Sequence, residues 1–278
     1  MKTQNMKKAV YFLLILIMVL SCTNKPQNND PIPPYETFQL KSIHVNEIRV
    51  INIWTPSDYK SSINSLPVLY MADGGIKEDF PHIANTISKL IENKSIPPII
   101  LVGIENTDRR KDLSGPSEVE ADSEYCPLSD GAKNFRAFIN EELVSEINRK
   151  YKTTDKKGLI GESLSGLFVI ETFFLNPESF DFYIAMDPSL WWNNHFLERN
   201  AKDYLESFPN KRTKLWFAGS SAEDISVHTN TLAKTLDNLS PVELVWKYSD
   251  EPNEKHNTIF RATKEKALTW ILNIEDKE

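Results

Sequence analysis

A serine, a histidine and several carboxylates occur in an order along the chain that suits nucleophilic catalysis. The segment GESLSG (161–166) stands where a short apolar run gives way to an apolar helical pattern. This is the context of a nucleophile elbow, a sharp turn that lifts a serine hydroxyl above a sheet. Residues two positions away must be small; Gly161 meets this demand, and Ser165 stands where a glycine is usual. We predict Ser163 as the nucleophile, with a simple helix cap as the alternative.

The serine needs a base, and the chain has five histidines. His256 lies in a polar loop (249–257) between the last predicted strand and the last predicted helix. The base of an α/β-hydrolase occupies this place, in the chain order Ser, acid, His. We therefore predict His256 as the base, although a polar loop histidine is often just solvated. The others lie in the early β region, in predicted helices or after a Trp pair: His44, His82, His228 and His195.

The acid of such a triad should follow a strand between the serine and the histidine. The apolar run 214–218 leads into Gly219-Ser220-Ser221-Ala222-Glu223-Asp224. Either Glu223 or Asp224 could accept the imidazole hydrogen bond and stabilise imidazolium. The other would be solvated or would place its charge near the start of the next helix. Asp187, after the preceding strand, is a third candidate.

An oxyanion hole requires two backbone amides near the nucleophile. The first would be the N–H of Leu164, directly after Ser163. The second comes from the loop after an earlier strand, where Asp73-Gly74-Gly75 follows the apolar run 68–72. Paired glycines let a backbone approach a substrate oxygen, but they also occur in ordinary turns.

Alternating strands and helices must position these residues. Two early segments alternate like strands of an antiparallel edge, and apolar runs further on read as buried strands. Helical patterns separate the later runs. We expect an α/β-hydrolase fold, with a mostly parallel central sheet and helices on both faces. The predicted strands are 36–45, 47–54, 68–72, 99–104, 158–160, 182–186, 214–218 and 242–248, and the main predicted helices are 132–150, 164–175, 227–236 and 259–274.

The N-terminus has the pattern of an export signal. Three lysines precede an uninterrupted apolar run (9–20), which is shorter than the about 20 residues of a membrane span. Val19-Leu20-Ser21-Cys22 resembles a bacterial lipobox. We predict a signal peptide (1–21), lipidation of Cys22, a flexible tether (22–35) and a catalytic domain (36–278). An uncleaved anchor helix is the alternative. The predicted location is the cell envelope, at the periplasmic face of the outer membrane.

Composition excludes several other classes of protein. The formal net charge is −7, which argues against a duplex-DNA binder, because phosphate contacts need a basic face. Two cysteines exclude a disulfide scaffold and a Cys-rich zinc module. No His/Asp/Glu cluster has metal-ligand spacing, so we expect neither a metal nor another cofactor. The sequence leaves the oligomeric state open.

Several segments together resemble the esterase family of the α/β-hydrolase superfamily, which includes esterase D-like, siderophore and feruloyl or acetyl xylan esterases. The segments appear in the family's order: PVLYMADGG (67–75), VGIENTDRRKDL (102–113), FINEELVSEINRKYKTTDKKGLIGESLSGLFV (138–169), FDFYIAMDPSLWW (180–192) and EKHNTI (254–259). The resemblance implies Ser163 as nucleophile and His256 as base. It also implies an acid in the segment 219–224, where the family often carries Glu, which favours Glu223 over Asp224.

The resemblance also implies roles in binding. Backbone amides of Gly75 and Leu164 would form the oxyanion hole. Arg109 would contact an anionic or catecholate-like substrate, unless it is a surface arginine paired with a neighbouring aspartate. Trp191 and Trp192 would wall the acyl or alcohol pocket, with core packing as the alternative for one of them.

These observations predict a serine-dependent carboxylic ester hydrolase that works through an acyl-enzyme. Its partners would be a small-molecule ester, of a siderophore or of a carbohydrate, and a membrane that holds its lipid anchor. The alternative is a catalytically degenerate α/β-hydrolase that binds a siderophore or glycan at the cell envelope. Ser165, at a position where the family usually has glycine, motivates this alternative.

Overall fold

The computed structural model of the protein describes residues 30–273. A compact unit begins at Pro31 and contains all the candidate catalytic residues. The predicted signal peptide, Cys22 and the first part of the predicted tether lie outside the described residues. The predicted division of the chain into signal, tether and catalytic domain therefore stays a prediction.

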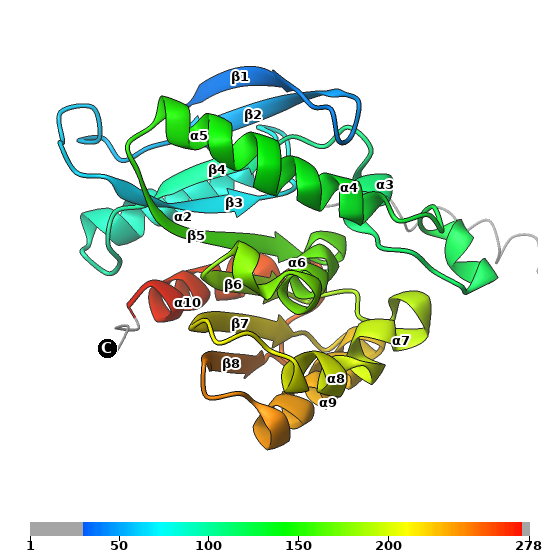
Figure 1. Cartoon of the computed structure of the whole chain (residues 1–278). Coiled ribbons are helices and arrows are strands. Elements are labelled where there is room, and N and C mark those ends of the chain that lie inside the picture. The colour runs from blue at the N-terminus through cyan, green and yellow to red at the C-terminus, as the bar shows by residue number, and fades with distance from the viewer. Residues whose placement is uncertain (1–29, 274–278) are drawn as a thin grey trace, which may run out of the picture. The chain divides into compact units, whose positions relative to one another are not determined.

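One sheet of eight strands forms the centre of this unit, in the spatial order β1-β2-β4-β3-β5-β6-β7-β8. Figure 1 shows the strands in this order from top to bottom. Their bounds are β1 (Glu36–Lys41), β2 (Ile48–Trp54), β3 (Leu66–Met71), β4 (Ile100–Ile104), β5 (Thr153–Glu162), β6 (Phe182–Met186), β7 (Thr213–Gly219) and β8 (Leu244–Asp250).

The pairing confirms the predicted fold class. Strand β2 pairs antiparallel with both β1 and β4, so the antiparallel edge lies at the N-terminal side. Every other neighbouring pair is parallel. The carboxyl ends of β3, β5, β6, β7 and β8 therefore meet at one edge, which is where ligands bind in sheets of this kind.

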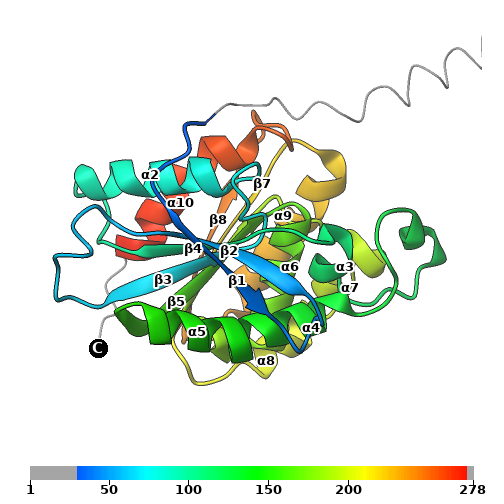
Figure 2. The same ribbon diagram turned by 90° about the horizontal axis from the view of Figure 1, so that it is seen from above.

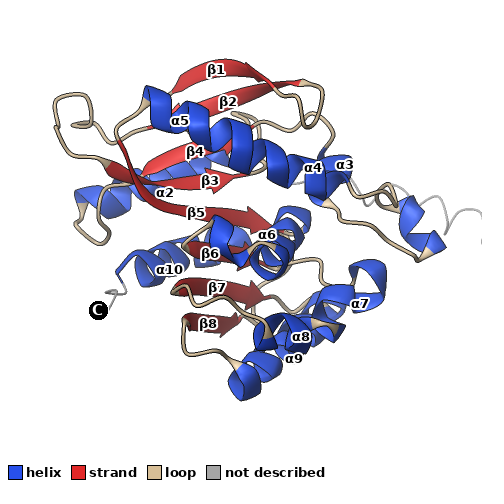
Figure 3. Ribbon diagram, in the orientation of Figure 1, coloured by secondary structure: helices blue, strands red, loops and turns tan. Residues whose placement is uncertain are grey.

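Helices cover both faces of the sheet (Figures 2 and 3). Helices α2 and α10 pack on one face, and the larger set that includes α6 and α9 packs on the other. Within residues 30–273, no helix is both long and apolar enough to cross a membrane. The helices and short helical turns are α2 (Phe80–Glu92), α3 (Arg109–Leu113), η1 (Glu120–Glu124), α4 (Gly131–Ala137), η2 (Phe138–Leu143), α5 (Val144–Lys150), α6 (Leu164–Leu175), η3 (Pro177–Ser179), α7 (Trp192–Arg199), α8 (Ala201–Glu206), α9 (Glu223–Leu239) and α10 (Ile259–Asn273).

Two predicted helices differ from the observed ones in an informative way. The helix predicted over 132–150 is one continuous rod, but its middle, η2, is a π-helical turn between α4 and α5. The helix predicted over 227–236 begins earlier, at Glu223. This earlier start places Glu223 and Asp224 in the first turn of α9, where negative charge stabilises the helix dipole.

Helix α6 carries the nucleophile elbow at its N-terminus and is enclosed on all sides. It contacts β5 and β6 beneath it and α3 and α8 above it. Eleven of its residues, from Leu164 to Phe174, are buried. A helix that is apolar all round has to be buried in this way, so the position of the elbow is fixed by the core.

Candidate active site

The structure joins a serine, a histidine and an aspartate in one chain of hydrogen bonds. His256 Nε2 lies 2.9 Å from Ser163 Oγ. On the other side of the ring, His256 Nδ1 lies 2.6 Å from Asp187 Oδ2. The three residues come from the β5–α6 turn, the residue after β6 and the β8–α10 loop. This arrangement matches the geometry of a nucleophile, its base and the acid that orients the base.

The elbow holds Ser163 in a backbone conformation that L-residues rarely adopt, with φ 61° and ψ −118°. Its N–H donates to the carbonyl of Met186, 2.9 Å away at the end of the neighbouring strand β6. Gly161 has to be a glycine, because a Cβ there would lie 2.5 Å from the backbone carbonyl of Ser165. Together these contacts turn the Ser163 hydroxyl out of the sheet, as predicted for an elbow.

Ser165 closes the same turn with its side chain. Its Oγ donates to the carbonyl of Glu162 at 2.9 Å and accepts the N–H of Glu162 at 2.8 Å. The hydroxyl is buried and satisfied in both directions. The departure from the usual glycine therefore adds two hydrogen bonds to the elbow.

The partner of His256 is Asp187, which corrects the prediction of Glu223 or Asp224. Both of those carboxylates are exposed in the first turn of α9. Asp187 is fully buried, and Ser220 donates to both of its oxygens, from its N–H at 2.6 Å and from its Oγ at 2.8 Å. Such donors offset the cost of burying a carboxylate.

The pKa of His256 is raised above the ordinary histidine value. The hydrogen bond with Asp187 is the largest cause, burial opposes it, and the negative charges of Glu162, Asp187 and Asp224 add to the rise. Imidazolium is therefore stabilised, which is what a base needs when it takes the proton of an attacking serine.

The two predicted oxyanion donors have different surroundings. Leu164 is the first residue of α6, and first-turn amides of a helix have no acceptor within the helix. Gly75 follows β3, which pairs with β5 so that Met71 stands beside Ile160. However, the N–H of Gly75 donates to Glu78 Oε2 at 2.7 Å. Glu78 was not recognised in the sequence as a residue of this site.

Arg109 ties the loop after β3 to the elbow. Its Nε and Nη2 donate to the two oxygens of Asp73 at 2.5 and 2.9 Å, and Nη2 lies 3.4 Å from the carbonyl of Glu162. Burial opposes ionisation of Asp73, but the Arg109 charge and hydrogen bonds, including one from Asn106, hold the pKa of Asp73 below its usual value. Arg109 thus pairs with Asp73 rather than with a sequence neighbour, and its contact with substrate stays a prediction.

The two tryptophans have separate roles. Trp192 is buried, and its Nε1 donates to the carbonyl of Gly115 at 3.1 Å. It also lines a cavity of about 350 Å³ together with Phe196 and Leu197. Trp191 is only partly buried and meets the ring of Tyr125 edge-on, with centroids 5.1 Å apart. Trp192 therefore packs in the core and also lines this cavity, and a role of either tryptophan in the wall of the substrate pocket stays a prediction.

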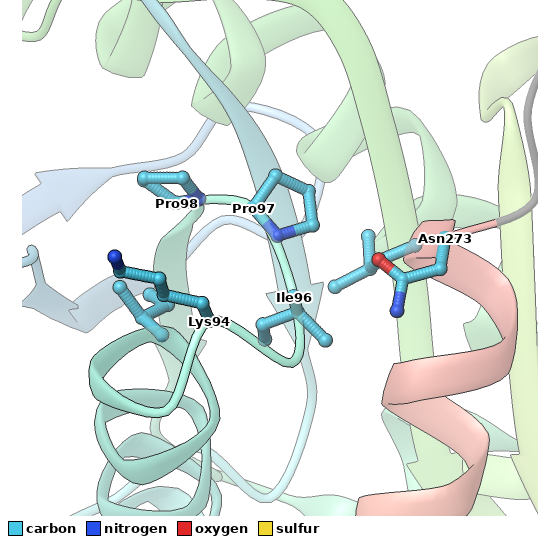
Figure 4. Close-up of a pocket in the computed structure, with 7 residues that line it drawn as sticks. Lys94, Ile96, Pro97, Pro98 and Asn273 are labelled. Atoms are coloured by element: carbon cyan, nitrogen blue, oxygen red, sulfur yellow. The ribbon is translucent and has the colours of Figure 1, made fainter.

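A second pocket lies far from Ser163, His256 and Asp187. It is lined by apolar and polar residues of the α2–β4 connection and by the end of α10 (Figure 4). Pro97 and Pro98 precede β4, so this pocket is at the amino ends of the strands, whereas the triad is at the carboxyl ends. Among the described residues, no group of three or more His, Cys, Asp or Glu side chains is placed to hold a metal ion.

Comparison with known proteins places this site in a family. Residues 42–276 match the family model "Putative esterase". Ferri-bacillibactin esterase BesA of Bacillus subtilis is 26% identical over 264 residues, which are 87% of this chain and 91% of that protein. A siderophore enterobactin esterase of Emericella nidulans is 35% identical over 78 residues, or 27% of this chain and 26% of that one. An IroE-like serine hydrolase from Shewanella oneidensis superposes with a TM-score of 0.76 at 26% identity, covering 86% of this chain and 80% of that chain.

The fold and the site together are those of an esterase of the α/β-hydrolase fold. The family match covers nearly all of the described sheet, from the end of β1 to α10. The chain belongs to this esterase family, and it is a carboxylic ester hydrolase.

The assignment of the acid can be tested by substitution. Asp187→Asn should lower kcat for ester hydrolysis by about 10⁴-fold, because the amide favours the wrong tautomer of His256. Glu223→Gln is the matched control and should keep kcat within about twofold, since the exposed Glu223 makes no such contact. Steady-state kinetics on both purified variants check this. An equal loss in the two variants would contradict the assignment of Asp187.

The pH dependence follows from the raised pKa of His256. The base must be neutral to accept a proton, and a raised pKa keeps it protonated to a higher pH. We expect kcat/KM for an uncharged ester to rise with pH and to reach half its plateau above the ordinary histidine value. Glu162→Gln should move this midpoint down, because the charge of Glu162 contributes to the shift. A midpoint below the ordinary value in the wild type would sink this interpretation.

Proposed function

We propose that this esterase hydrolyses siderophore esters, with Ser163, His256 and Asp187 as its catalytic residues. The observation that carries the proposal is the hydrogen-bond chain from Ser163 Oγ through His256 to the buried Asp187. Its two distances are within the range expected of a nucleophile and an oriented base.

The reaction would proceed by acyl transfer to the enzyme. Ser163 Oγ attacks the ester carbonyl carbon while its proton passes to His256 Nε2. The tetrahedral intermediate collapses, the carbon–oxygen bond to the alcohol breaks, and His256 returns the proton to the leaving alkoxide. Water then attacks the acyl-enzyme by the same route, which releases the acid and restores Ser163. Asp187 holds the imidazole in position throughout.

The substrate class is supported by the names of relatives. BesA is a ferri-bacillibactin esterase, and it matches this chain over 91% of its own length. The relative from Emericella nidulans is a siderophore enterobactin esterase. We therefore favour siderophore esters over the feruloyl and acetyl carbohydrate esters that other α/β-hydrolases cleave.

The geometry of the elbow argues against a degenerate enzyme that only binds its ligand. That alternative rested on Ser165 in place of glycine. In the structure Ser165 supports the turn through both of its hydrogen bonds with Glu162. Ser163 and His256 are meanwhile within hydrogen-bond distance.

We further propose that the enzyme is anchored in the cell envelope by a lipid on Cys22. The support is in the sequence, where three lysines, an apolar run and Val19-Leu20-Ser21-Cys22 follow one another. The segment 23–34 would then act as the tether between the membrane and the sheet. A location at the periplasmic face of the outer membrane would put the enzyme on the path of imported siderophores.

Substitution of the nucleophile tests the proposed activity. Ser163→Ala should lower kcat by about 10⁶-fold on p-nitrophenyl acetate and on a ferric siderophore triester. Thermal unfolding should show that the variant is folded. Ser165→Gly is the matched control, and it should retain covalent labelling of Ser163 by a fluorophosphonate. Undiminished turnover by Ser163→Ala would overturn the assignment, and preference for feruloyl sugars or acetylated xylan would overturn the substrate class.

Removal of the lipid attachment point tests the proposed location. Cys22→Ser, expressed with its full N-terminus in a bacterium, should move the protein from the membrane fraction to the soluble fraction. Cys126→Ser is the control, because this buried thiol lies inside the domain. Immunoblots of the separated fractions check this. If Cys22→Ser stayed with the membrane, an uncleaved anchor helix would be the better explanation.

A further inference from the structure

The carboxylate of Glu78 accepts a hydrogen bond from the backbone amide that the esterase reaction would use to bind an oxyanion. Its Oε2 accepts the N–H of Gly75 at 2.7 Å, and its Oε1 accepts a hydrogen bond from Asn106 Nδ2 at 3.0 Å. Both oxygens are therefore engaged. Gly75 itself is buried and Glu78 is half-buried, so this contact is partly shielded from solvent.

Two observations place this amide beside the nucleophile. The parallel pairing of β3 and β5 sets Met71 against Ile160, so the residues after each strand emerge next to one another. Arg109 then bridges the two turns, because it donates to Asp73 and reaches the carbonyl of Glu162. The N–H of Gly75 therefore lies at the same edge of the sheet as Ser163.

A single N–H cannot serve two anions at full strength. An oxyanion donor has to point at the place where negative charge develops on the substrate, and the loss of one such donor costs about 10²- to 10³-fold in kcat. A carboxylate left on that donor would also repel the oxyanion. Gly75 can therefore act in catalysis only after Glu78 has moved away.

We propose that Glu78 is a displaceable plug of the oxyanion hole, which an ester carbonyl must remove from Gly75 before Ser163 attacks. The proposal rests on the proposed function of Ser163. Displacement costs free energy, and contacts with parts of the substrate remote from the ester can supply it. Glu78 is then a specificity-determining residue that favours large esters, such as siderophore lactones, over small ones.

The electrostatics make this plug removable. Burial raises the pKa of Glu78, and the charge of Asp73 acts in the same direction, while the hydrogen bonds from Gly75 and Asn106 oppose the rise. The net rise means that the charged carboxylate is less stable here than in water. Its release into solvent, or its neutralisation by a proton, therefore recovers part of the cost of breaking the bond to Gly75.

A purely structural role makes a different prediction. An acidic side chain that accepts the N–H three residues before it resembles a capping box, in which Gln works as well as Glu. If Glu78 only shaped the loop, Glu78→Gln would leave activity unchanged and Glu78→Ala would lower it. A plug requires the opposite sign, because Ala frees the N–H of Gly75, and Gln, which can still accept that N–H, removes the charge that repels the oxyanion.

The experiment compares Glu78→Gln and Glu78→Ala with the wild type. We expect kcat/KM for p-nitrophenyl acetate to rise about ten- to hundredfold in both variants, the size of effect expected from releasing one charged hydrogen bond. The second-order rate of labelling by a small fluorophosphonate should rise by a similar factor. Turnover of a ferric siderophore triester should rise less. Glu105→Gln is the matched control, because Glu105 also packs against Gly75 but does not hold its N–H.

The outcomes separate the two proposals. If the wild type labels at Ser163 but neither folded Glu78 variant gains activity on the small ester, the plug is overturned and the esterase assignment stands. A gain in Glu105→Gln as large as in Glu78→Gln would also overturn it, since it would show a general charge effect. If folded wild-type protein neither labels nor hydrolyses esters, both proposals fail.

Discussion

Each of three neighbouring strands is followed by a residue with a positive φ. The active site depends on this backbone constraint. Asp73 after β3, Ser163 after β5 and Asp187 after β6 have φ values of 54°, 61° and 49°. Such conformations cost about 1–3 kcal/mol for a residue other than glycine, so surrounding contacts must impose them. Arg109 holds Asp73, Ser220 holds Asp187, and the carbonyl of Met186 accepts the N–H of Ser163. The hydrogen bonds of the site thus also stabilise its strained backbone.

The sequence was sufficient for the features that depend on local pattern. Apolar runs predicted the parallel strands, because a strand covered on both faces has to be apolar throughout. The elbow could be predicted from Gly161 and Ser163 at a change from strand to helix. His256 followed from its loop and from the chain order of α/β-hydrolases. Each of these inferences needs only neighbouring residues and the order of elements.

The features that the sequence did not predict are contacts between distant segments. Asp187 and Glu223 both follow a strand and precede His256, so order alone does not distinguish them. The distinction comes from the early start of α9, which leaves Glu223 exposed, and from the β8–α10 loop, which carries His256 onto Asp187. A usable signal was present, since Asp187 directly follows a fully apolar strand, at the sheet edge where ligands bind. Arg109 and Asp73, 36 residues apart, offered no such signal.

A departure from a family motif gains its meaning from the contacts around it. Glycine at position 165 would leave the N–H and the carbonyl of Glu162 without the Ser165 hydroxyl. Serine is small enough to fit this turn and also supplies a donor and an acceptor. A backbone held in this way resists relaxation of Ser163 toward an ordinary φ. The substitution that first suggested a weakened catalyst is thus better explained as a second way to build the same rigid turn.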